Sequence, residues 1–150
     1  MSETLHIDAS KWEKIAATGL DAAKIDQLIA ACAAAHSEYI SVGLACGIRA
    51  AFRMLGEMGG DRAKPTVDKV SVKANGCVAI AFMVITCANP CQGGMDFVED
   101  RAPDWRVCGS NARRRVEIKM QDAFFANADA VFAAADSQLF ASVSVTDLAQ

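Results

Sequence analysis

The order of hydrophobic periodicities along the chain is the feature that most constrains its fold. Apolar residues recur at helical spacing before Gly59-Gly60, alternate with polar residues between positions 67 and 120, and return to helical spacing after Asp122. A polar linker containing Pro65 separates the first block from the second. Because the strands are grouped rather than alternating with helices, the pattern predicts an α+β fold. In this fold N-terminal helices pack on a central, mainly antiparallel sheet, followed by a C-terminal helix.

The first part of the chain predicts three helices. A short helix through Trp12 would end at Gly19, and Asp21 can cap a second helix whose apolar stripe includes Cys32. The third helix is expected from Val42 to Met58. Since Cys32 lies on an apolar stripe, we expect it to be a buried, unreactive thiol.

Asn75-Gly76 leaves two alternatives open for the apolar segment Cys77–Thr86. As a type I′ turn, Asn75-Gly76 would make this segment the second strand of a hairpin. As an N-cap, Asn75 would instead begin a short buried helix. The β-branched residues of the segment favour the strand by propensity.

Alternation and turn residues predict the other elements of the second half. Strands are expected at 67–73, 95–99, 105–108 and 115–120, the last being the clearest alternation in the chain. A final helix capped by Asp122 is expected over about 122–136, with a weaker extension beyond it.

Composition limits the class of protein. A chain of 150 residues with 53% hydrophobic and 22% charged residues is expected to form one ordered domain. The net charge is −3, and the single basic run, Arg113-Arg114-Arg115, is too short to indicate a nucleic-acid surface. The N-terminus lacks a secretion signal, and the most apolar run, 12 residues at 77–88, is too short to span a membrane. We therefore expect a cytoplasmic protein.

Cysteine is the residue type that points to chemistry. Four of the six cysteines lie between positions 77 and 108, namely Cys77, Cys87, Cys91 and Cys108. In a reducing compartment, such cysteines serve more often as metal ligands, redox groups or small buried side chains than as disulfides. Thiolates bind zinc and iron–sulfur clusters, although the spacing here is not the paired C-x2-C of a zinc ribbon.

The leading hypothesis is a cysteine-centred metal or redox site. Cys77, Cys87 and Cys91 are its main candidates, with Cys108 and His36 in a second tier. A reversible disulfide between Cys87 and Cys91 is an alternative, and so is an enzyme that uses Cys91 as a nucleophile with His36 as its base.

Two glycines in the third helix suggest a different kind of site. Gly43 and Gly47 lie four residues apart on one helix face, and each costs about 1 kcal/mol relative to alanine. Either close helix packing or the approach of a ligand offsets that cost. The alternative function is thus a non-catalytic accessory or binding protein, with a small organic ligand or cofactor held beside Gly43, Cys46 and Gly47.

Four segments in the same order resemble the FmdE-like domain family, which takes its name from a component of formylmethanofuran dehydrogenase. They are Gly43-Leu-Ala-Cys-Gly-Ile-Arg-Ala-Ala, Val70-Ser-Val-Lys-Ala-Asn-Gly-Cys, Gly93-Gly-Met-Asp-Phe-Val-Glu-Asp and Arg114-Arg-Val-Glu-Ile-Lys. The resemblance covers about residues 36–122, which it implies to be the core of the domain, preceded by N-terminal helices in 1–35. It implies an α+β fold, a homodimer and a metal, commonly zinc, held by cysteine and histidine, and it favours a helix after Asn75.

The resemblance departs from the family at its first motif, His-Gly-His-x-Cys-Pro-Gly. Matching Gly43 to the last glycine places Ser41 at the cysteine, and Ser37 and Tyr39 at the histidines. Cys77 is the one ligand that can be carried over, from the family's Asn-Asp-x-Cys motif. Either new thiols rebuild the site, or the fold is reused without the metal.

Overall fold

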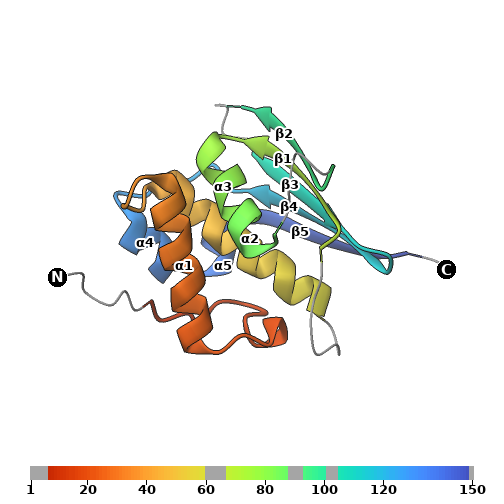
Figure 1. The fold of residues 1–150 in the computed structure, drawn as a ribbon, viewed down its shortest axis with the longest axis horizontal. Coiled ribbons are helices and arrows are strands. Elements are labelled where there is room, and N and C mark those ends of the chain that lie inside the picture. Colours follow the sequence, from red (N-terminus) through yellow and green to blue (C-terminus); the bar gives the residue numbers. More distant parts are fainter. Residues whose placement is uncertain (1–6, 60–66, 88–92, 101–104, 149–150) are drawn as a thin grey trace.

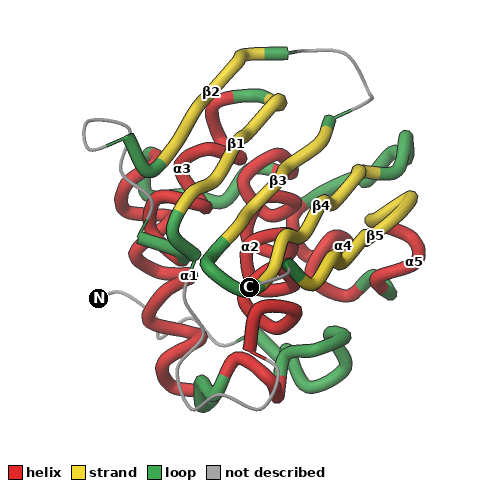
Figure 2. Tube along the Cα trace, turned by 90° about the vertical axis from the view of Figure 1, so that its right-hand side faces the viewer, coloured by secondary structure: helices red, strands yellow, loops and turns green. Residues whose placement is uncertain are grey.

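The protein folds as a five-stranded sheet with helices packed on one of its faces (Figure 1). The computed structural model describes residues 7–59, 67–87, 93–100 and 105–148. Figure 2 shows the strands in front of the helices, so that no described helix covers the second face of the sheet, which is called the open face below. Within the described ranges, no helix is long and apolar enough to cross a membrane.

Five α-helices and a short 3-10 helix are present in the described parts of the chain. They are the 3-10 helix η1 (Ala16–Thr18), α1 (Ala22–His36), α2 (Val42–Gly59), α3 (Gly76–Ile85), α4 (Ala128–Ala133) and α5 (Asp136–Leu139). The strands are β1 (Lys69–Ala74), β2 (Met95–Glu99), β3 (Arg106–Ser110), β4 (Arg114–Met120) and β5 (Phe140–Asp147).

The strands lie in the order β2-β1-β3-β4-β5. β1 and β2 are parallel, and α3 lies between them in the chain, as parallel pairing requires a crossover. The remaining neighbours are antiparallel. The predicted α+β fold with a mainly antiparallel sheet is therefore confirmed.

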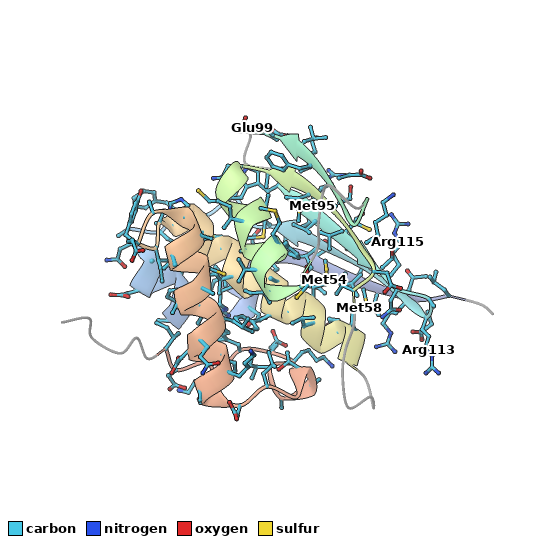
Figure 3. The ribbon with its side chains drawn as sticks, viewed as in Figure 1. Met54, Met58, Met95, Glu99, Arg113 and Arg115 are labelled. Atoms are coloured by element: carbon cyan, nitrogen blue, oxygen red, sulfur yellow. The ribbon has the colours of Figure 1, made fainter. Side chains whose placement is uncertain are left out.

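Helix α2 lies at the centre of the core. Figure 3 shows Met54 and Met58 projecting from α2 towards the sheet, whereas Arg113 and Arg115 lie at the β3–β4 hairpin. Gly109 on β3 faces Met54, whose sulfur occupies the space that a side chain at position 109 would need.

Alternation of polar and apolar residues explains the two faces of the sheet. Val70 and Val72 of β1 are buried, and the lysines that flank them in sequence are exposed.

Asn75 begins a helix, not a hairpin strand. Its Oδ1 accepts a hydrogen bond from the Val78 N–H at 3.3 Å, which caps α3. The helix then packs closely on α2, because Gly47 leaves room for the backbone of Val78. The β propensity of this segment is overridden by burial on several sides, where helix packing decides the conformation.

The predicted helix over 122–136 is wrong in its extent. Residues 121–127 are not helical, and α4 begins after Asn127, whose Oδ1 accepts from the Ala130 N–H at 2.9 Å. Phe124, an apolar residue within the predicted helix, is 93% exposed. The weak extension after it is mainly strand β5, which pairs with β4 at the sheet edge.

The first predicted helix is also shorter than expected. Lys14 has a φ of 67°, which interrupts a helix between Trp12 and η1. Gly19 does end the segment in the left-handed conformation, with a φ of 73°. The second and third predicted helices correspond to α1 and α2, and the predicted cap at Asp21 is present, with Oδ1 accepting from the Lys24 N–H.

Candidate functional site

Two predicted site residues, His36 and Cys77, meet in the folded chain. His36 Nε2 lies 3.1 Å from Cys77 Sγ, within the range of a hydrogen bond to sulfur. The two residues are 41 positions apart in the sequence. Both side chains are partly buried, so the pair lies at the edge of the core and not deep inside it.

Local structure places each member of the pair. His36 is the last residue of α1, and the chain turns directly after it because Glu38 adopts a φ of 69° and its N–H bonds the Ala33 carbonyl at 2.8 Å. Cys77 is the second residue of α3, two positions after the N-cap Asn75. The positive end of a helix favours negative charge within its first turn, which is where Cys77 lies.

The imidazole of His36 has two further neighbours. Ser37 Oγ lies 3.0 Å from Nδ1, and the ring of Tyr39 packs edge-on at 5.3 Å between centroids. If Nδ1 carries the proton and donates to Ser37, Nε2 is left as an acceptor for the thiol proton of Cys77. The serine contact is therefore compatible with the tautomer that a general base needs.

Cys87 and Cys108 do not lie at this pair. Cys87 follows α3 at its opposite end, about 15 Å along the helix axis from Cys77, and is exposed with a φ of 62°. Cys108 pairs with Ser71 in the sheet register and therefore lies on the open face, where Arg115 Nε donates to its sulfur at 3.1 Å. Cys91 lies outside the described residues.

Two cysteines are buried in the core. Burial raises the pKa of Cys32 to about 12 and that of Cys46 to about 11, with Arg49 acting in the opposite direction on Cys46. Both thiols keep their protons near neutral pH and are poor nucleophiles there. The expected burial of Cys32 is confirmed, because its exposed fraction is 0%.

The donors in the described part of the chain do not fit a zinc ion or an iron–sulfur cluster. Among those residues, no group of three or more His, Cys, Asp or Glu side chains is arranged to hold a metal. His36 and Cys77 supply two ligands, whereas structural zinc takes four. Metal binding that includes Cys91 stays a prediction.

A cavity of about 290 Å³ lies beside the start of α2. Gly43 and Cys46 line it, as the binding hypothesis expects, and Asn75 forms part of another wall. Gly47 does not line the cavity, since it packs against Val78 and Ala81 of α3. The two glycines therefore serve different purposes.

Comparison with known proteins adds no family assignment: no family model matches the chain, and no curated protein matches it significantly. The resemblance to the FmdE-like domain family stays a prediction from the quoted segments.

Sequence reasoning placed both members of the pair in one candidate site, but as a base it assigned His36 to Cys91. The pairing depends on the packing of α1 against α3, which no local pattern contains. One sequence signal could have pointed to His36 as a partner of Cys77. His36 directly precedes Ser37, the position that the family resemblance matches to the first histidine of the motif. The contribution of Ser37 itself was missed.

Proposed function

We propose that this protein works through a thiol–imidazole centre formed by Cys77 and His36. The observation that carries the proposal is the 3.1 Å contact between His36 Nε2 and Cys77 Sγ. It is supported by the position of Cys77 in the first turn of α3 and by the partial exposure of both side chains. Of the metal and redox alternatives, the redox one needs only these two residues.

The reaction class that suits this pair is thiol–disulfide exchange. His36 takes the Cys77 proton, and the thiolate attacks one sulfur of a small disulfide such as oxidised glutathione. A new S–S bond forms on Cys77, the old S–S bond breaks, and the departing thiolate takes the proton from the imidazolium. The protein then carries a mixed disulfide that reduced glutathione reverses by the same steps.

Further proposals agree with this chemistry. A reducing compartment such as the cytoplasm keeps Cys77 available as a thiol. Membership of the FmdE-like family remains part of the proposal, because Cys77 is the residue that the resemblance carries over.

We also propose a homodimer. β2 and β5 are edge strands that each pair on one side within the described sheet, and an exposed edge can pair with a second copy of the chain.

The proposed centre is tested by limited alkylation of the native protein. Trace iodoacetamide at pH 7, followed by peptide mass spectrometry, gives a relative rate for each cysteine. We expect Cys77 to react faster than Cys87, although Cys87 is the more exposed thiol. In His36→Gln the Cys77 rate should fall about ten-fold, because the proton acceptor is lost.

Cys87 is the matched control, since no imidazole contact is observed for it in the described part of the chain. Its rate should not change in His36→Gln, so a change at both cysteines would indicate altered folding. A Cys77 rate equal to that of Cys87, or insensitive to His36→Gln, would refute the thiol–imidazole centre. In oxidised glutathione, the mass of one glutathione should appear on Cys77 and be absent in Cys77→Ser.

A further inference from the structure

The cavity beside Gly43 is a second site, separate from the thiol–imidazole pair. Its walls come from the start of α2, from Asn75 and Trp105, and from the segment after β4. Cys77 does not line it, although Asn75 is only two residues away. A ligand in the cavity would therefore not contact the Cys77 thiol.

Aromatic and aliphatic side chains form much of the cavity wall. Trp105 and Phe125 contribute aromatic rings, and Met120 and Leu139 contribute flexible apolar surface. The Trp105 ring is held in place because its Nε1 donates to the Asp100 carbonyl at 3.0 Å. Aromatic walls favour a flat, aromatic ligand, which gains stacking or edge contacts in addition to burial.

Three polar side chains also line the cavity. The side-chain nitrogen of Asn75 packs against Gly43, and a Cβ added at Gly43 would lie 2.8 Å from this nitrogen. The side-chain oxygen of Asn75, Oδ1, already accepts a hydrogen bond from the Val78 N–H. The amide nitrogen is thus the group of Asn75 that can donate to a ligand. Gln121 Nε2 donates to the Ser137 carbonyl at 3.4 Å, which leaves its amide oxygen, together with the Asp122 carboxylate, to accept.

Charge narrows the ligand class further. Among the described residues that line the cavity, none is Lys, Arg or His, and Asp122 is the one acidic residue. Burial raises the pKa of the Cys46 thiol to about 11, so this wall stays neutral. A phosphate or carboxylate would lose its hydration here without gaining a cationic partner.

We propose that the cavity binds a planar, uncharged nitrogen heterocycle that carries a carbonyl acceptor and an N–H donor, as in a lactam. The carbonyl accepts from Asn75, the N–H donates to Gln121 or Asp122, and the ring lies against Trp105 and Phe125. This site is independent of the thiol chemistry proposed for Cys77.

The test uses two bicyclic probes of similar shape, quinolin-2(1H)-one and quinoline-2-carboxylate. The first is a neutral lactam and the second an anion. The chain has two tryptophans, Trp105 in the cavity wall and Trp12, whose Nε1 donates to the Phe132 carbonyl in the core. In ¹⁵N-labelled protein, the lactam should shift the indole signal of Trp105 in a saturable way and leave that of Trp12 in place.

Two adjacent phenylalanines provide a matched pair of variants. Phe125→Ala removes a ring that lines the cavity and should weaken lactam binding about ten-fold. Phe124→Ala removes a ring that is 93% exposed and should change binding less than about two-fold. An unchanged Trp12 signal shows that each variant is folded. Cys77→Ser should bind the lactam as the original chain does.

Several results would overturn the proposal. They are no saturable shift of Trp105 with the lactam, equal binding of the carboxylate, and equal effects of Phe124→Ala and Phe125→Ala. Loss of lactam binding in Cys77→Ser would join the cavity to the thiol centre and refute the two separate sites. Failure of the alkylation test would leave these expectations unchanged, because none of them depends on His36.

Discussion

Arg49 and Asp136 form a buried ion pair, with Nη2 of Arg49 2.7 Å from Oδ1 of Asp136. The side chains are 1% and 3% exposed, and the same guanidinium bonds the Val131 and Ala134 carbonyls at the end of α4. Burial lowers the pKa of Arg49, and Asp136 acts in the opposite direction. The pair joins α2 to the C-terminal region.

Removal of one partner should strongly destabilise the fold. Asp136→Ala leaves Arg49 buried without its counterion, and we expect a loss of about 3 to 5 kcal/mol in the free energy of unfolding, measured with denaturant. Glu13 is the control: its carboxylate is 61% exposed and 3.6 Å from Arg53, so Glu13→Ala should cost less than about 1 kcal/mol. Similar losses in both variants would argue against a special role for the buried pair.

Gly47 should not tolerate a side chain. A Cβ at this position would lie 2.7 Å from the Val78 Cα, so α2 and α3 would have to separate. We expect Gly47→Ala to lose about 1 to 3 kcal/mol despite the better helix propensity of alanine. In Gly76→Ala, where the added Cβ meets nothing within 4 Å, stability should stay the same or rise by up to about 1 kcal/mol. Thermal or denaturant unfolding of both variants distinguishes packing from propensity.

Cys32 should make the protein sensitive to alkali. Its pKa is raised from 9.0 to about 12 in the folded chain, so its contribution to stability is fully present below pH 9 and is lost as pH rises from 9 to 12. Between pH 9 and 10.5 that loss should be about 2 kcal/mol. The pH dependence of denaturant unfolding should therefore be weaker in Cys32→Ala by about this amount. Cys87→Ala removes an exposed thiol and not a buried one, so its unfolding free energy should depend on pH as that of the unmutated protein does.

The open face of the sheet carries a row of like charges. Arg106 on β3 lies directly opposite Lys73 on β1 and Lys119 on β4. Like charges in this register are destabilising, so Arg106→Glu should raise stability by about 0.5 to 1 kcal/mol at low salt. The gain should shrink at high salt because surface charges are screened. Arg113→Glu, in the exposed β3–β4 turn, is the control with the same change in net charge. An equal gain in that variant would trace the effect to net charge and not to the register.

Patterns that are local in the chain predicted much of the fold. Alternation predicted the strand around Val116 and Ile118, because each residue of a half-buried strand shows its environment directly in its polarity. The long helix α2 was equally clear, with an apolar face repeated over several turns. These elements carry enough residues for the period to be unambiguous.

Where a segment is short or buried on several sides, its pattern was not sufficient. Residues 122–127 have the apolar spacing of a helix, but the cap at Asn127 starts α4 later and Phe124 points into solvent. β5 pairs with the edge of β4, and the polar–apolar alternation over residues 142–146, which fits a strand, was not recognised in the sequence. The outcome in both places depends on partners distant in the chain.

The candidate sites, like the fold, were predictable from local sequence only in part. The residue types and capping signals were in the sequence: a cysteine two residues after Asn75, a histidine before the glycine-bearing helix, and two glycines spaced by one helical turn. The tertiary structure decided which of them meet. Packing of α1 on α3 brings His36 to Cys77, and the length and direction of α3 keep Cys87 away. Gly43 borders a cavity and Gly47 a helix contact, because α2 meets different neighbours at successive turns. A sequence specifies which groups are present and how each short segment folds, but proximity between distant residues arises from the packing of whole elements.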